Sequence, residues 1–117
     1  MQPNQINIPF AKWSLWRLLL GVKTATTRTK PYGSPGDWFE VDFYPLSLDI
    51  TKTYRLVDIK FVPLLDIVTR WYKEEGCLAP EEFIDIWNEI HPKRGYDPEQ
   101  NVHLHLFEMM KYEIKEQ

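Results

Sequence analysis

An amine, several hydroxyls and a guanidinium are gathered in one short segment, Gly21-Val22-Lys23-Thr24-Ala25-Thr26-Thr27-Arg28. A helix that ends at Gly21 and a strand that follows it would place Lys23 in the turn between them. Side chains alternate along a strand, so Thr26 and Arg28 share one face. A lysine near a threonine hydroxyl can turn that hydroxyl into a nucleophile. The segment therefore predicts a site for an anion or a nucleobase, with a plain solvated strand as the alternative.

Basic side chains dominate the first third of the sequence. No acidic residue precedes Asp37, although the net charge of the whole chain is -3. The basic residues in this region are Lys12, Arg17, Lys23, Arg28 and Lys30. This asymmetry favours one basic face that contacts phosphates, whereas ordinary solvated side chains are the alternative reading. Trp38, directly after Gly36 and Asp37, is the best candidate for stacking on a base.

The elements that must position these residues follow from periodicity. Helical spacing of apolar residues predicts helices over residues 10–20, 64–75 and 80–90. The first of these has an apolar stripe that includes Trp13, and its other tryptophan, Trp16, is also assigned to the core. Alternating or β-branched stretches predict strands over residues 24–29, 38–44, 54–62 and 102–107, and a polar tail over about 111–117 is expected to fray. This order, without βαβ repeats, predicts an α+β domain with a small mixed or antiparallel sheet rolled into a barrel.

Length and composition limit the class of protein. With 117 residues the chain is expected to form a single domain over residues 1–117. Its one cysteine, Cys77, cannot form an internal disulfide, which favours a reducing compartment and a cytoplasmic location. The longest apolar stretch ends at Gly21 and is too short to span a membrane. We expect a monomer without a cofactor.

The pattern Gly-x-Lys-Thr-x-Thr-x-Arg, with Gly36 and Asp37 opening the next strand, resembles the ASCH domain family. The opening Met1-Gln2-Pro3-Asn4 and the helix before the motif are similar to the bacterial N4-acetylcytidine amidohydrolase branch of that family. The resemblance covers nearly the whole chain. It implies a PUA-like β-barrel decorated by about three helices, with a cleft for RNA or a modified nucleoside.

The same resemblance implies roles for individual residues. In the amidohydrolase branch Lys23 would be the base, Thr26 the nucleophile and Glu75 the proton donor, with Glu74 as the alternative if the register slips by one. The residues expected to contact RNA or a nucleoside are Arg28, Lys30, Gly36, Asp37, Trp38, Lys12 and Arg17. Two functions stay open: an RNA-binding or RNA-metabolism module, which we place first, and an amidohydrolase that deacetylates N4-acetylcytidine.

Other candidate ligands carry weaker signals. His103 and His105 stand at i and i+2 of a strand, and His91 could add a third metal ligand. No cysteine pair or carboxylate–histidine motif accompanies them, so we expect two exposed strand histidines and no metal site. Cys77 is expected to be a packing or surface residue.

Overall fold

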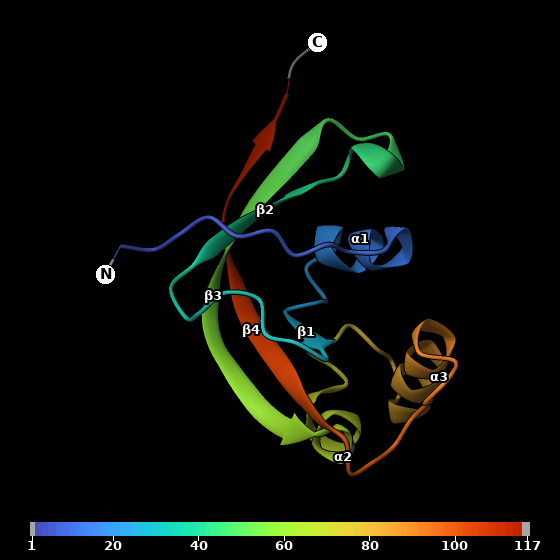
Figure 1. Ribbon diagram of the computed structural model, residues 1–117. Coiled ribbons are helices and arrows are strands. Elements are labelled where there is room, and N and C mark those ends of the chain that lie inside the picture. The colour runs from blue at the N-terminus through green and yellow to red at the C-terminus, as the bar shows by residue number, and fades with distance from the viewer. Residues whose placement is uncertain (1, 116–117) are drawn as a thin grey trace.

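A strongly curved antiparallel sheet forms the centre of the domain (Figure 1). The computed structural model describes residues 2–115. The strands are β1 (Ala25–Arg28), β2 (Trp38–Asp42), β3 (Ile50–Pro63) and β4 (Asn101–Ile114), in the spatial order β1-β4-β3-β2. Each neighbouring pair is antiparallel. The expected α+β class with an antiparallel sheet is therefore confirmed.

Three α-helices accompany this sheet within residues 2–115: α1 (Lys12–Leu19), α2 (Leu64–Asp66) and α3 (Pro80–Ile90). A 3₁₀ turn covers Tyr44–Leu46, and a π-helical turn covers Ile67–Trp71. Helix α1 lies inside the curve of the sheet (Figure 1), and α3 packs against the π-helical turn. The buried residues fall into two clusters, one around α1 and Phe39 and the other between α3, β1 and the start of α2.

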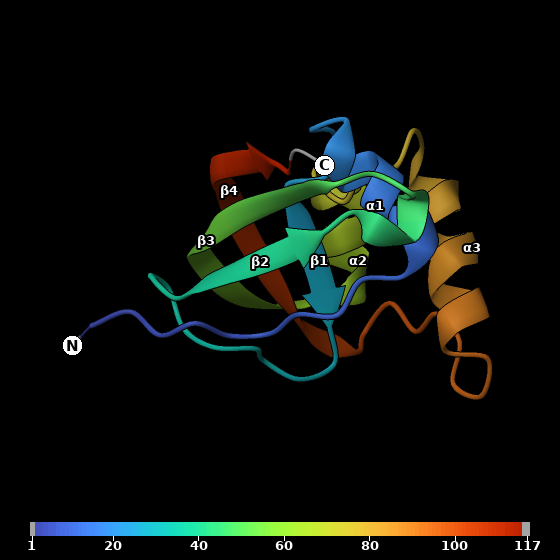
Figure 2. The same cartoon turned by 90° about the horizontal axis from the view of Figure 1, so that it is seen from above.

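The sheet is curved like a barrel wall, but it does not close into a continuous ladder among the described residues. Strands β1 and β2 form its edges. The N-terminal segment runs along β2, where Trp38 N donates to Asn4 O over 3.0 Å and Ile6 N donates to Trp38 O over 2.8 Å (Figure 2). The same segment then reaches the other edge, since Arg28 Nη2 donates to Pro9 O over 2.7 Å. The expected barrel is thus an open sheet whose edges are bridged by the N-terminal segment.

Two elements differ from the sequence-based expectation. Strand β4 continues through Lys111 to Ile114, because the start of β3 pairs with it as far as Ile50. The expected frayed tail is therefore wrong for residues 111–114, and residues 116–117 lie outside the described part of the chain. The helix expected over 64–75 is α-helical only over Leu64–Asp66 and then widens into the π-helical turn.

Helix α1 also buries a different face from the expected one. Ser14, Leu15 and Leu18 are its buried residues. Trp13 and Trp16 are 38% and 50% exposed, so their assignment to the core was wrong. Helix α1 packs inside the curve of the sheet, and the small Ser14 and the flexible leucines fit there better than indole rings. In the described residues, no helix has the length and apolar character needed to cross a membrane.

Candidate functional site

A cavity of about 370 Å³ lies between strand β1 and helix α3. Its polar wall comes from β1 and from the two segments that flank that strand's N-terminal end, and its apolar wall comes from α3. The polar lining residues include Lys23, Thr26, Thr27, Arg28, Lys30 and Glu75, and the lining residues of α3 are Phe83, Ile86, Trp87 and Ile90, with His91 directly after the helix. A cavity of this size is suited to a small molecule such as a nucleoside.

Lys23 and Glu75 form a buried ion pair in this cavity. Lys23 Nζ donates to Glu75 Oε1 over 3.1 Å and to the Glu75 backbone oxygen over 3.2 Å. The two side chains are only 3% and 7% exposed. Burying charges is costly unless they are paired and hydrogen-bonded, so this pair is a defined feature and not a chance surface contact.

The second carboxylate oxygen of Glu75 has its own partner. Thr27 Oγ1 donates to Glu75 Oε2 over 2.7 Å, and both residues are buried. The carboxyl group is therefore held at both oxygens by side chains of the segment that carries the Lys-Thr-x-Thr motif. Thr27 was not among the residues expected in the site, because its neighbours in the strand carry the family motif and it does not.

Thr26 lies next to the guanidinium of Arg28. Arg28 Nε donates to Thr26 Oγ1 over 3.1 Å. The Thr26 hydroxyl is the acceptor in this hydrogen bond, so its own proton can be transferred to a base. The Arg28 guanidinium also lies over the rings of Phe10 and Tyr32, at 5.2 and 5.6 Å from their centroids. Burial lowers the pKa of Arg28 from its ordinary value, and Tyr32 and Glu75 act in the opposite direction. A fixed cation beside a hydroxyl stabilises negative charge that develops on the oxygen.

The local backbone explains why these side chains meet. Val22 N and Lys23 N both donate to Arg17 O, so the end of α1 fixes Lys23 in the turn before β1. Thr24 N and Ala25 N both donate to Glu74 O, over 2.7 and 2.9 Å. This pairing holds the turn that follows the π-helical segment against the start of β1. It places Glu75, and not Glu74, beside Lys23.

The structure brings together five of the expected site residues: Lys23, Thr26, Arg28, Lys30 and Glu75 all line the cavity. The expectation that Lys23 belongs to the turn agrees with the structure, since β1 begins at Ala25. The α3 wall was not expected, because its apolar spacing is the ordinary signal of a core helix.

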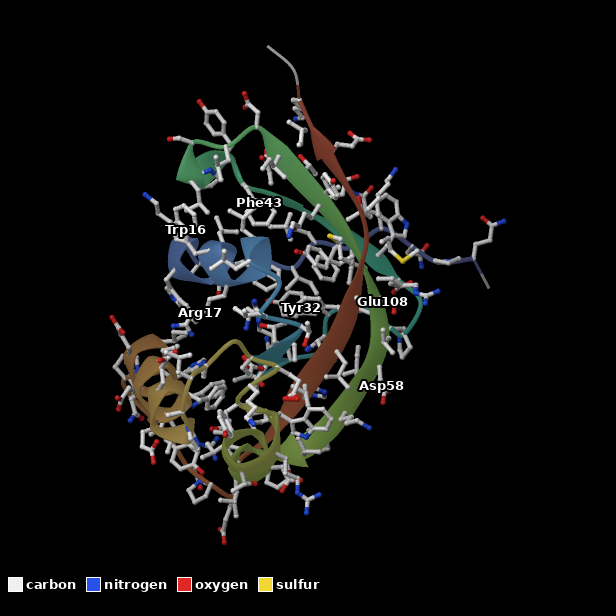
Figure 3. The ribbon with its side chains drawn as sticks, turned by 180° about the vertical axis from the view of Figure 1, so that it is seen from behind. Trp16, Arg17, Tyr32, Phe43, Asp58 and Glu108 are labelled. Carbon is white, nitrogen blue, oxygen red and sulfur yellow. The ribbon has the colours of Figure 1, made fainter. Side chains whose placement is uncertain are left out.

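The other expected contact residues lie outside the cavity lining: Lys12, Arg17, Gly36, Asp37 and Trp38. Arg17 points from α1 toward α3 (Figure 3), where its Nη2 lies 2.7 Å from Glu82 Oε1. Asp37 accepts hydrogen bonds from Asn4 N and Ser34 N and so holds the loop before β2. Trp38 opens β2, next to the N-terminal segment.

His105 is fully buried, which corrects the expectation of two exposed strand histidines. Its Nε2 accepts from Tyr32 N over 2.9 Å, so the ring proton is on Nδ1, which faces Thr26 O at 3.2 Å and His103 O at 3.0 Å. Burial lowers the pKa of His105. Both ring nitrogens are used inside the protein, and neither is available to a metal.

Cys77 is buried at the edge of the cavity. Burial, with Glu75 and Glu82 nearby, raises the pKa of its thiol to about 11. The thiolate is the reactive form of cysteine, so this environment disfavours reaction at Cys77. The burial of Cys77 agrees with the packing role expected from the sequence.

The fold defines a class of protein: an α+β domain in which a curved antiparallel sheet carries a cavity at its short edge strand. The same fold occurs in the crystal structure of protein EF3133 from Enterococcus faecalis V583, assigned to the family model DUF984. The TM-score is 0.63 with 14% sequence identity, over 100% of this chain and 85% of that chain. At this identity the likeness shows the fold alone. No family model and no curated protein matches the sequence.

Proposed function

We propose that the protein is a small amidohydrolase that removes the acetyl group from N4-acetylcytidine or a closely related acylated nucleoside. The main support is the placement of Lys23 and Glu75, separated by 52 positions in the sequence, as a buried pair in a cavity that Thr26 also lines. These are the three residues to which the family resemblance assigns the base, the proton donor and the nucleophile.

In the proposed reaction Thr26 Oγ1 attacks the acetyl carbon. Lys23 Nζ, which bonds to Glu75 in the resting site and lines the same cavity as Thr26, takes the hydroxyl proton when substrate is bound. Arg28, whose Nε bonds to Thr26 Oγ1, stabilises the negative charge that develops on that oxygen. The bond from the acetyl carbon to N4 then breaks, and a proton from Glu75 goes to N4 as cytidine leaves. Water hydrolyses the acetyl ester on Thr26 and releases acetate. A proton-transfer group in such a step contributes about 10²–10⁴-fold to the rate.

The ion pair is compatible with this scheme without any change in the number of bound protons. A neutral amine on Lys23 and a protonated carboxyl on Glu75 differ from the ion pair only by the move of one proton across 3.1 Å. The site holds the same total charge before and after that move. The reactive form therefore differs from the resting ion pair only in which side chain carries the proton.

The geometry favours this function over the RNA-binding module. A binder needs basic side chains spread over a surface wide enough for several phosphates. Here several basic side chains bond to acidic neighbours instead: Arg17 to Glu82, Arg55 to Glu108, Lys60 to Asp58 and Arg94 to Asp97. RNA binding would depend on the basic side chains of Lys12, Lys30 and their neighbours. It is the alternative function that a negative activity assay would favour.

The test is release of cytidine and acetate from N4-acetylcytidine by the purified protein. We expect turnover that is lost in Thr26→Ala and Glu75→Gln and kept in Thr69→Ala, a matched threonine control whose hydroxyl bonds to Leu65 O away from the cavity. A folded wild-type protein without turnover would contradict the proposal. Salt-dependent binding of single-stranded RNA would then be measured to test the alternative.

A further inference from the structure

We infer that Thr27 is a positioning residue for Glu75, an inference that rests on the proposed hydrolase function. Thr27 takes part in neither proton transfer nor nucleophilic attack in the proposed reaction. Its hydroxyl nevertheless makes the shortest contact to the Glu75 carboxyl, 2.7 Å to Oε2, against 3.1 Å from Lys23 Nζ to Oε1.

The placement of Thr27 in the strand makes a hydroxyl at this position unusual. Thr27 pairs with Leu104 across the sheet, and both Leu104 and the alternate residue Ala25 belong to the apolar cluster beneath α3. An apolar β-branched side chain would satisfy this position as a packing residue. Burying a hydroxyl there costs free energy unless it is hydrogen-bonded, and its acceptor is Glu75.

The contact determines which carboxyl oxygen exchanges a proton with Lys23. With the Thr27 hydroxyl donating to Oε2, that oxygen is occupied as an acceptor. A proton that moves from Lys23 then resides on Oε1, the oxygen that faces Nζ. Thr27 therefore fixes both the rotation of the carboxyl group and the site of its proton. It acts through Glu75 and does not contact the reacting atoms.

Adjacent threonines thus hold different parts of one site. Thr26 and Thr27 point to opposite faces of β1, as alternation requires. Thr26 Oγ1 accepts from Arg28, whereas Thr27 Oγ1 donates to Glu75. Both threonines line the cavity.

The experiment compares Thr27→Val, which keeps the shape and removes the hydroxyl, with Thr27→Ser, which keeps the hydroxyl. We expect Thr27→Val to lower kcat for N4-acetylcytidine by about 10²-fold at unchanged KM, as for a misplaced catalytic group. The acidic limb of its pH–rate profile should move to higher pH, because the carboxylate loses a donor that favours its charged form. Thr27→Ser should restore both kcat and the profile. Thr27→Ala serves as a second hydroxyl-free variant if Thr27→Val does not fold.

Several outcomes would overturn the inference. An unchanged kcat and pH profile in folded Thr27→Val would show that the hydroxyl has no role in the reaction. An acetyl group trapped on Thr27, found by mass spectrometry of the quenched protein, would make Thr27 the nucleophile instead. Both results require an active wild-type protein, so they leave the proposed hydrolase function standing. An inactive wild-type protein would overturn both proposals.

Discussion

Gly76 and Lys23 approach each other so closely that a side chain at residue 76 would crowd the lysine. A Cβ added to Gly76 would lie 3.2 Å from Lys23 Cβ and 3.2 Å from Arg17 Cδ. Gly76 also has a φ of +90°, a conformation that other residues rarely adopt. Directly after Glu75, this glycine lets the chain turn while the carboxyl stays against Lys23.

We therefore expect Gly76→Ala to destabilise the protein by about 1–3 kcal/mol, the range for a non-glycine residue in a sparsely populated backbone region. It should also lower activity, because the methyl group would press on Lys23, whose Nζ bonds to Glu75. Gly36→Ala is the control, since Gly36 has a φ of +96° but no atom within 4 Å of the position that the new methyl group would take. Urea unfolding and turnover measure the two effects, and equal loss of activity in both variants would contradict the explanation.

The buried pair itself predicts strong non-additivity. Lys23→Met leaves the Glu75 carboxylate buried without its cation, and such a change costs about 3–5 kcal/mol. Lys23→Met combined with Glu75→Gln removes both charges and should recover part of that loss. Urea unfolding of the single and double variants gives the coupling energy. Additive losses would mean that the two side chains do not interact in solution.

His105 predicts a loss of stability in acid. Burial lowers the pKa of His105 in the folded protein, so the unfolded chain takes up a proton there first as the pH falls below about 6.5. Proton uptake by the unfolded state favours unfolding. We expect His105→Gln, whose amide oxygen can replace Nε2 as the acceptor from Tyr32 N, to show a flatter decline in urea titrations between about pH 7.5 and about pH 5.

The Cys77 thiol predicts that stability falls at alkaline pH. The folded state holds the pKa of Cys77 at about 11, above its ordinary value of 9.0, so the unfolded chain loses this proton first as the pH rises. Stability should therefore fall as the pH rises from 9.0 toward about 11. The decline should be smaller in Cys77→Ala, which should also keep wild-type turnover. Rapid alkylation of the folded protein by iodoacetamide at neutral pH would contradict the buried, protonated thiol.

Much of this molecule follows from local sequence patterns. Helix α3 has the bounds that its proline start and apolar spacing predict. The motif from Gly21 to Arg28 predicts a turn, a strand and a polar site, because glycine and β-branched residues act on the backbone within a few residues of themselves. Four of the expected site residues, Lys23, Thr26, Arg28 and Lys30, come from this motif or follow it directly, and all line the cavity.

Only the tertiary structure decided which distant residues complete the site. Backbone pairing of Glu74 with the start of β1, beyond the π-helical turn over Ile67–Trp71, selects Glu75 over Glu74. The partner of Thr27, the burial of His105 and the apolar wall on α3 also depend on contacts between segments far apart in the chain. Sequence periodicity reports which side of an element is apolar. It does not report which element that side packs against, because packing depends on how all the elements are arranged in the fold.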